Sequence, residues 1–401
     1  MKWITEEANS LQTELAAHRR WLHEHAEVGF DLTQTKEYVR RELEQMGIVA
    51  ENCGKAGLVA VLGNPDSGKS ILLRADMDAL PIPEESGVDF ACPNGNMHAC
   101  GHDMHTAMLL GAAKLLKNHE YELPGTVKLM FQPAEETFEG AKDMIEHGVL
   151  SNPKPDAAVM IHVTAATPLP AGMVIICPPG VSAPAADYFT IMVQGKGCHG
   201  SAPHTGIDAL TAASHILLAL QEIHARELPS GENAVLTIGT FQGGTAPNVI
   251  ADTATLAGTI RTYSERTRNF LKKRMQSISC SIAEAYRASA TVEFGSGCPS
   301  LVNDKALGEL LNASLKETLA DNMVLNAAEM RGTIRGRGSE DFAYISQEVP
   351  SVMLALAAGQ PAQGYTYPQH HPKVRFDESV LCTGTAIFVS CALGFLSRND
   401  S

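Results

Sequence analysis

The sequence is short of positive charge. Its 401 residues include 31 Lys and Arg against 45 Asp and Glu, which gives a formal net charge of -14. It contains no Lys/Arg-rich run and no basic helical face, so attraction to nucleic acid or to an anionic membrane has little electrostatic support. We therefore expect neither nucleic acid nor a membrane as a partner, and a small molecule or peptide as substrate.

The sequence also lacks the hydrophobic segments that direct a chain into a membrane. Residues 1–20 carry acidic residues and no apolar signal-peptide core, and no later segment offers 18 uncharged apolar residues in a row. The nine cysteines are odd in number and scattered, without a Cys-x-x-Cys pair. Such usage is typical of reduced thiols in a large intracellular protein. We therefore expect a cytoplasmic protein.

Two short stretches concentrate groups that bind metals or transfer protons. Residues 97–105 read Met-His-Ala-Cys-Gly-His-Asp-Met-His, and residues 132–136 read Gln-Pro-Ala-Glu-Glu. A lone histidine or a lone Glu-Glu pair is usually an ordinary polar residue or a solvated face. Here a thiol and three imidazoles accompany paired acids, and this combination indicates a metal site with a general base.

Short apolar strands alternate with helices in the first part of the chain. The predicted strands are 58–62, 71–73, 127–131 and 157–161, and the predicted helices are 6–25, 33–46 and 103–117. This alternation predicts an α/β fold with a mixed, mostly parallel sheet.

Polar side chains come at the ends of several of these strands: Asp76, Asp78, Glu135, Glu136 and His162. In an open α/β sheet the carboxyl ends of parallel strands meet at one edge, where ligands bind. We therefore expect these side chains to converge at that edge. Cys100 and His102, at the start of the helix over 103–117, would face the same edge.

The middle of the chain has a different order of elements. Strands are predicted over 188–194, 234–241, 253–262 and 291–294, with helices over 207–225 and 264–288, which is the βαββαβ order of a ferredoxin-like sandwich. Gly- and Pro-rich linkers flank it. We predict an inserted α+β domain over 184–296, within a catalytic domain made of 1–183 and 297–401. Beyond it we expect helices over 305–322 and from Ser339, and a strand over 352–358.

A series of motifs runs along nearly the whole chain, at residues 20–23, 76–81, 97–103, 132–136, 195–204, 246–250, 258–262, 339–342 and 370–378. In this order they resemble the M20 family of metallopeptidases and amidohydrolases. The resemblance is to the branch that includes hippurate hydrolases, bacterial aminoacylases and plant auxin-conjugate hydrolases.

The resemblance implies a site for two divalent metal ions. The positions that match the family's ligands are Cys100, His102, Glu136, His162 and His370. Glu135 matches the general base, and Asp78 matches an acid that orients a ligand histidine. Zn, Co or Ni would suit the Cys and His ligands, and the carboxylates admit Mn. His371 directly follows His370, so the sequence leaves open which of these two histidines binds metal.

The resemblance also implies that the inserted domain is a lid and dimerisation domain, so that the protein is a homodimer or a dimer-based oligomer. His199 matches a histidine that reaches the partner subunit's site and stabilises an oxyanion. Asn248 and Arg261 match positions that hold the substrate's carbonyl or carboxylate. The alternative for His199 is an ordinary surface histidine, and for Arg261 a salt bridge at a strand edge.

The function implied is a metal-dependent amidohydrolase. It would hydrolyse the amide bond of N-acyl amino acids, such as N-acetyl, N-benzoyl or related conjugates, through a metal-bound water. A dipeptidase or carboxypeptidase of the same family is an alternative. A catalytically silent metal-binding scaffold is another, but the presence of Glu135 and of a complete ligand set argues against it.

Overall fold

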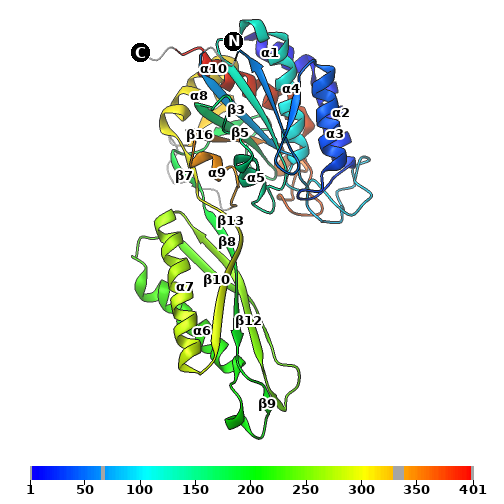
Figure 1. Cartoon of the computed structure of the whole chain (residues 1–401). Helices are drawn as coiled ribbons and strands as arrows, with labels where there is room; N and C mark the ends of the chain where they lie inside the picture. The colour runs from blue at the N-terminus through cyan, green and yellow to red at the C-terminus, as the bar shows by residue number, and fades with distance from the viewer. Residues whose placement is uncertain (1, 65–67, 328–337, 399–401) are drawn as a thin grey trace. The chain divides into compact units, whose positions relative to one another are not determined.

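The computed structural model describes residues 2–64, 68–327 and 338–398. The chain divides into two compact units (Figure 1). The first unit takes the described parts of residues 1–182, 301–335 and 341–401, and the second takes those of 183–300 and 336–340. The second unit is therefore inserted, in sequence, between two segments of the first.

An eight-stranded sheet forms the centre of the first unit, in the order β1-β2-β4-β3-β5-β16-β6-β15. Its strands are β1 (Ala50–Cys53), β2 (Gly57–Gly63), β3 (Ser70–Asp76), β4 (Thr126–Gln132), β5 (Ala157–Thr164), β6 (Val174–Ile176), β15 (Val324–Asn326) and β16 (Ser351–Ala357). The neighbours β4, β3, β5 and β16 run parallel, whereas β1, β2 and β6 pair antiparallel with their neighbours β2, β4 and β16. The prediction of a mixed, mostly parallel sheet is confirmed.

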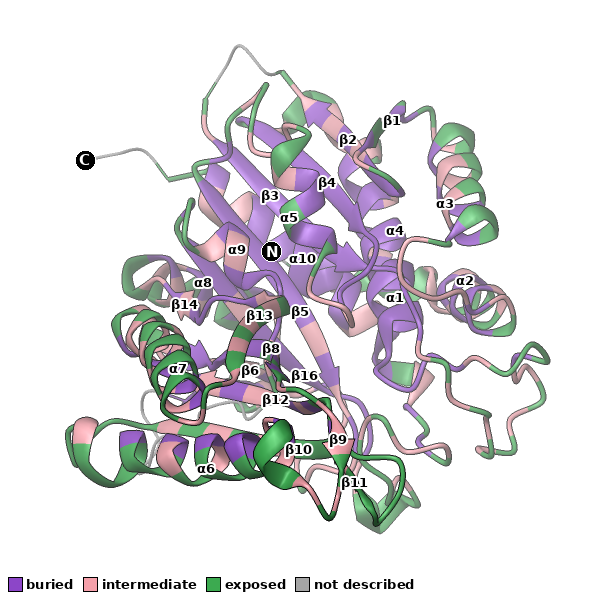
Figure 2. Cartoon of the chain, turned by 60° about the horizontal axis from the view of Figure 1, so that its bottom comes forward, coloured by how far each residue is buried: buried purple, intermediate pink, exposed green. Residues whose placement is uncertain are grey.

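Helices cover both faces of this sheet, which explains why its central strands are continuous apolar runs. Every residue of β3 and β4 is buried (Figure 2). One face carries α1 (Lys2–Ser10), α2 (Gln12–Glu24), α3 (Thr33–Gln45), α4 (His102–Asn118), α8 (Lys305–Thr318) and α10 (Leu381–Leu396). On the other face α5 (Gly140–Glu146) packs against β4, and α9 (Ala343–Ser346) packs against β16.

Helix α10 was not among the predicted elements. Together with the turn before it, α10 forms the segment Glu378–Leu396, which is long and apolar enough to cross a membrane by length and composition. The search for uninterrupted apolar residues did not find this segment, because Thr, Ser and Gly interrupt it. In the structure 67% of its most apolar window is buried, and α10 packs against α4, α8 and β3. A helix that is apolar on nearly all sides and enclosed in this way is a core helix.

The second unit has a four-stranded antiparallel sheet in the order β10-β12-β8-β13. Its strands are β8 (Ala185–Gln194), β10 (Ala234–Gly243), β12 (Thr253–Thr262) and β13 (Ser289–Cys298), and its helices are α6 (Ala209–Glu222) and α7 (Glu265–Ala285). Both helices pack on one another and on the sheet, around a core that includes Ile191, Ile216, Leu256 and Leu271. The strand and helix order is that of a ferredoxin-like sandwich.

Two short two-stranded ribbons complete the fold. In the second unit β9 (Cys198–His199) pairs with β11 (Val249–Ile250). At the segments where the chain leaves and re-enters the first unit, β7 (Gly180–Ala183) pairs with β14 (Leu301–Asn303).

Three predicted elements differ from the structure. The helix expected over 6–25 is two helices, α1 and α2, interrupted at Leu11. The helix expected from Ser339 begins four residues later, as α9 at Ala343, and the Ser339 hydroxyl accepts a hydrogen bond from Arg261 Nη1. His162 lies within β5 rather than after it, since pairing with β16 extends the strand to Thr164.

Candidate metal centre

The carboxyl edge of the parallel strands gathers the residues that were predicted to bind metal. Several groups of possible ligand atoms overlap there, and two of them consist of the predicted ligands: Cys100 with His102 and His162, and Cys100 with Glu136 and His370. Within each group the ligand atoms lie within 4.8 Å of one another. The Cys100 sulfur belongs to both groups, so it could serve as a ligand at either metal position.

The fold orients two of the imidazoles through backbone carbonyls. His102 Nδ1 donates to the carbonyl of Asp78 at 2.8 Å, and His162 Nδ1 donates to the carbonyl of Val163 at 2.7 Å. A carbonyl oxygen can only accept, so in its neutral form each ring carries its proton on Nδ1 and its lone pair on Nε2. His162 Nε2 lies 3.5 Å from the Cys100 sulfur. Both rings are therefore in the tautomer that can ligate a metal through Nε2.

Two buried atoms at this edge have no hydrogen-bond partner within the described part of the chain. They are His102 Nε2 and Glu136 Oε1, which lie 3.9 Å apart. Glu136 Oε1 also lies 3.4 Å from His370 Nε2. Leaving buried polar atoms unpaired is costly, and a divalent cation at each of the two positions would satisfy them. The thiol, imidazole and carboxylate set therefore fits a pair of divalent metal ions.

The charges around Cys100 and Glu136 favour their anionic forms. Burial alone would raise the pKa of the Cys100 thiol, but the nearby His162 and His102 imidazoles outweigh it and lower the pKa to about 6. Burial likewise tends to raise the pKa of Glu136, and His370 and His102 lower it below the ordinary value. A thiolate and a carboxylate are the forms that bind metal.

A tight turn after β4 sets the directions of Glu135 and Glu136. The turn spans residues 135–138 and is closed by a hydrogen bond from the N–H of Phe138 to the carbonyl of Glu135. The non-glycine residues Ala134 and Phe138 adopt positive φ angles of 52° and 59° on either side of the pair. Backbone strain of this kind concentrates at functional sites. Glu136 faces His370, while Glu135 Oε2 lies 3.9 Å from His102 Nε2.

The carboxylate of Asp78 holds this turn. Its two oxygens accept from the backbone N–H groups of Glu135 at 3.0 Å and Glu136 at 3.1 Å. The family resemblance suggests that this acid orients a ligand histidine, and Asp78 Oδ1 lies 3.5 Å from His102 Nδ1, which donates its hydrogen bond to the Asp78 carbonyl. Asp78 therefore contacts both His102 and the backbone of the glutamate pair.

His370, and not His371, belongs to the ligand groups. His370 has a φ of 65°, and its N–H donates to the carbonyl of Ala99 at 2.9 Å, which ties it to the segment that carries Cys100. The ring of His371 instead stacks on Tyr367 with centroids 4.4 Å apart, and its Nδ1 accepts from the N–H of Lys373.

Residues 19–23 anchor the start of α4, beside His102. The Asp103 carboxylate accepts from Arg19 Nε at 3.0 Å and pairs with His23 Nδ1 at 2.8 Å. Burial tends to lower the pKa of His23, but hydrogen bonds to Asp103 and Glu84 outweigh it and raise the pKa to about 9. The imidazolium is therefore the stable form of His23 at neutral pH.

The remaining predicted site residues lie in the second unit. The β9–β11 ribbon places His199 opposite Val249, and the N–H of Gly200 donates to the carbonyl of Asn248 at 2.8 Å. His199 Nδ1 accepts from the backbone N–H of Ser201 at 3.1 Å, so the ring proton lies on Nε2. Arg261 Nη1 donates to Ser339 Oγ at 2.6 Å.

Sequence reasoning placed Asp76 at this edge and singled out the stretch that ends at His105, but it missed Arg74 and the contacts that these buried residues make behind the ligands. Asp76 Oδ1 lies 2.6 Å from His105 Nδ1, and His105 Nε2 accepts from the N–H of Val163. Asp76 also pairs with Arg74. Two features of the sequence could have pointed to these buried residues. One is an arginine two residues before Asp76 on the same strand, and the other is a histidine three residues after His102 on the same helix.

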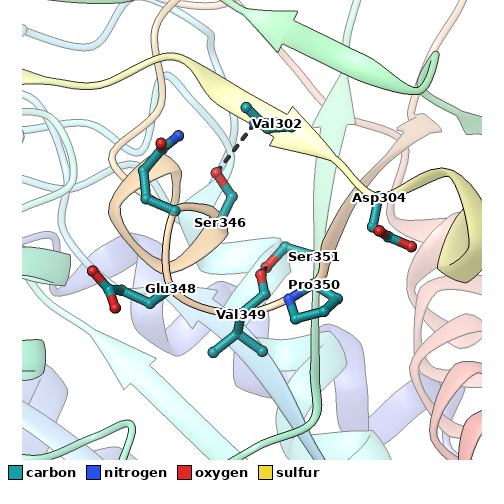
Figure 3. A pocket seen from close by; sticks show the side chains of 8 residues that line it. Val302, Asp304, Ser346, Glu348, Val349, Pro350 and Ser351 are labelled. Atoms are coloured by element: carbon teal, nitrogen blue, oxygen red, sulfur yellow. Dashed lines mark hydrogen bonds between the residues drawn. The ribbon is translucent and has the colours of Figure 1, made fainter. Parts of the chain in front are cut away.

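A surface hollow of about 210 Å³ lies away from these groups (Figure 3). It is lined by Val302, Asp304 and residues 346–351, and Ser346 Oγ accepts from the N–H of Val302 at 3.1 Å. Ser351 is the first residue of β16, so the hollow lies at the amino end of that strand. The ligand groups gather at the carboxyl end, and the hollow is therefore separate from the candidate metal centre.

Comparisons with known proteins agree with this geometry. The model of peptidase family M20/M25/M40 matches residues 72–394. The chain is 34% identical to N-acetyl-L-cysteine deacetylase of Bacillus subtilis (strain 168), with 99% of this chain and 93% of that protein covered. It is 35% identical to IAA-amino acid hydrolase ILR1-like 2 of Arabidopsis thaliana, with 100% and 92% covered.

A solved structure extends the likeness to three dimensions. The YXEP protein of Bacillus subtilis, described as a dinuclear metal binding peptidase from the M20 family, superposes with a TM-score of 0.79 at 32% identity. The match covers 96% of this chain and 99% of that one.

Proposed function

The chain belongs to peptidase family M20/M25/M40, and from this membership we propose that it is a metal-dependent amidohydrolase that hydrolyses the amide bond of N-acyl amino acids. Relatives named for the deacetylation of N-acetyl-L-cysteine and for the hydrolysis of IAA-amino acids support this substrate class. The observation that carries the proposal is the pair of overlapping ligand groups with a second carboxylate, Glu135, beside them.

The ligand groups define which residues would hold the metals. Cys100, His102 and His162 would hold one divalent ion, and Cys100, Glu136 and His370 would hold the other. We propose Zn, Mn, Co or Ni as the ions, since thiolate and imidazole suit Zn, Co and Ni and the carboxylates admit Mn. Such ions, when bound, polarise a carbonyl oxygen and lower the pKa of water.

Glu135 is the proposed general base. Its backbone is fixed by Asp78, and its Oε1 lies 3.4 Å from the backbone N–H of Asp341, which supports a defined orientation of the carboxylate. Glu135 would take the proton of the water that attacks the amide carbonyl. The protonated carboxyl would then give this proton to the leaving nitrogen, so that a carboxylic acid and a free amino acid are released.

Residues of the second unit would complete the site. We propose residues 184–296 as a lid and dimerisation domain in a homodimer, with His199 donating its Nε2 proton to the oxyanion in the partner subunit's site. The contact of His199 with the Ser201 backbone supports this tautomer. Asn248 would hold the substrate carbonyl and Arg261 its carboxylate. We propose a cytoplasmic location, because scattered cysteines without a Cys-x-x-Cys pair are typical of intracellular proteins.

Subunit mixing tests the proposed role of His199. We expect His199→Ala to lower kcat by about 10²- to 10³-fold, because an oxyanion donor is lost. Ser201→Ala, the matched control, removes the hydroxyl that lies 2.8 Å from His199 Nδ1 but keeps the backbone N–H that fixes the tautomer, so it should lower kcat by no more than about threefold. Mixing inactive His199→Ala with inactive Glu135→Gln under conditions of subunit exchange should restore about a quarter of wild-type activity, because each heterodimer contains one complete site.

Two results of this experiment would count against a shared site. Full activity of His199→Ala would remove the histidine from catalysis. Mixed dimers that form, as detected by differential tagging, but recover no activity would show that His199 does not act across the dimer.

The substrate class is tested by amino acid release. N-acetyl and N-benzoyl amino acids carry no free α-amino group at the acyl side, whereas dipeptides do. We expect the metal-loaded protein to release amino acid from the acylated substrates. Preferential cleavage of dipeptides would favour the peptidase alternative.

A further inference from the structure

A buried cation lies behind the candidate metal centre and joins two carboxylates. Arg74, on β3, has its Nη1 2.7 Å from Asp76 Oδ2 and its Nη2 3.1 Å from Asp341 Oδ1. Its Nε donates to Gln132 Oε1 at 2.9 Å. All four side chains are inaccessible to solvent or nearly so. Three donors that point in fixed directions to three different side chains suit arginine and not lysine.

The first carboxylate, Asp76, leads to the ligand histidines. Its Oδ1 accepts from His105 Nδ1 at 2.6 Å, and His105 Nε2 accepts from the N–H of Val163, the residue after His162, at 2.9 Å. Because the N–H of Val163 can only donate, the imidazole of His105 is neutral and carries its proton toward Asp76. Asp76 Oδ2 also lies 3.5 Å from His102 Nε2. Asp76 is thus positioned to fix both ligand-bearing segments.

The second carboxylate, Asp341, leads to the proposed general base. Its Oδ1 accepts from Gln132 Nε2 at 2.7 Å and its Oδ2 accepts from the N–H of Ala141 at 2.9 Å, so the side chain is held from three directions. The backbone N–H of the same residue lies 3.4 Å from Glu135 Oε1. Fixing the Asp341 side chain therefore fixes a donor that faces the base.

The two carboxylates depend on the same cation. Without Arg74, two anions would remain in a solvent-free region, where an uncompensated charge is strongly disfavoured. They would have to bind protons, admit water or move apart. Each of these responses would shift groups that contact His105 or Glu135.

We propose that Arg74 is a positioning residue that gives the metal ligands and the general base one common anchor, through Asp76 on one side and Asp341 on the other. This inference rests on the proposed roles of Glu135 and of the ligand histidines. It assigns Arg74 and Asp341 no contact with substrate.

The chain offers a matched control for this proposal. Lys128, on β4, is a second buried cation in the same sheet, and its ammonium donates to the carbonyls of Val149, Ser151 and Pro153 at 3.0, 2.6 and 2.8 Å. These acceptors belong to a segment without any candidate ligand. Arg74→Met and Lys128→Met each remove a buried charge from the sheet, but only the first should affect the metal centre.

The test measures Co²⁺ affinity by chelator competition, and kcat and KM at saturating metal. We expect Arg74→Met to weaken Co²⁺ binding by about 10- to 100-fold and to lower kcat by about 10²-fold, with KM within about threefold. Arg74→Lys should recover part of both losses.

Asp341→Asn should lower kcat by at least about tenfold while Co²⁺ affinity stays within about threefold. This substitution loosens only the contacts on the side of Glu135 and not those on the side of Asp76. Lys128→Met should change neither quantity by more than about twofold, even if it lowers Tm.

Several results would overturn the proposal. One is wild-type Co²⁺ affinity and kcat in folded Arg74→Met, and another is equal losses in Lys128→Met. If Arg74→Met does not fold, the proposal would be overturned by unchanged kcat in Asp341→Asn together with unchanged Co²⁺ affinity in Arg74→Lys. A wild-type protein that binds Co²⁺ but cleaves no N-acyl amino acid would refute the proposed function alone, since the affinity comparison between Arg74→Met and Lys128→Met would still stand.

Discussion

Glu135→Gln is expected to retain two metal ions per chain and to lose about 10³- to 10⁴-fold in kcat, with little change in KM. Glutamine keeps the shape of the side chain, and its oxygen can still accept from the N–H of Asp341, so the turn and the ligands should remain in place. It cannot take a proton from water or return one to the leaving nitrogen. The measurement is steady-state hydrolysis, with metal content determined on the same sample.

Glu139→Gln is the matched control for this experiment. Glu139 lies four residues further along the same turn, and its side chain is exposed. We expect its activity to stay within about twofold of wild type, because surface substitutions of this kind have small effects. Activity of Glu135→Gln within tenfold of wild type would contradict the assignment of the base. Loss of metal in that variant would mean that Glu135 is a ligand.

Cys100→Ala is expected to disrupt both metal positions and to lower activity by at least about 10³-fold. The sulfur is the one atom that both ligand groups share, so its removal leaves each group with two ligands. We expect metal content to fall from about two ions per chain to less than one after dialysis. Single replacement of His162 or His370 should affect one position more than the other.

Cys92→Ala is the control, because Cys92 is as buried as Cys100 (7% against 8% exposed) and belongs to neither ligand group. It should keep full metal content and activity. Cys100→Ala with two tightly bound ions would refute the shared ligand.

The pKa of the Cys100 thiol also predicts a pH effect. Since this pKa is lowered to about 6, protons compete with metal mainly below pH 6. The metal affinity of the wild type should therefore be weaker at pH 5 than at pH 7.

The parts of the site that sequence could predict are those that follow strand ends. Asp78 and the Glu135–Glu136 pair come directly after apolar runs, and parallel strands bring their carboxyl ends to one edge. The thiol and imidazole of Cys100 and His102 stand out by chemistry alone. These features are local, so periodicity and residue type were enough to find them.

The parts that sequence could not predict depend on long-range contacts. The Arg74–Asp341 pair joins residues 267 positions apart, and no local pattern marks it. The extension of β5 past His162 depends on pairing with β16, and the hydrogen bonds from the glutamate pair to the Asp78 carboxylate depend on side-chain direction. Helix α10 was missed because a helix buried on nearly all sides has no amphipathic period.

The central claim is that two divalent metals and Glu135 hydrolyse N-acyl amino acids, and release of free amino acid tests it most directly. The protein would be stripped of metal, refilled with Mn, Co, Ni or Zn, and given a mixture of N-acetyl and N-benzoyl amino acids. We predict no release without metal, release with at least one metal, and loss of that release in Glu135→Gln. Release that persists in the stripped protein, or no release with any metal from a folded protein that binds two ions, would contradict the account.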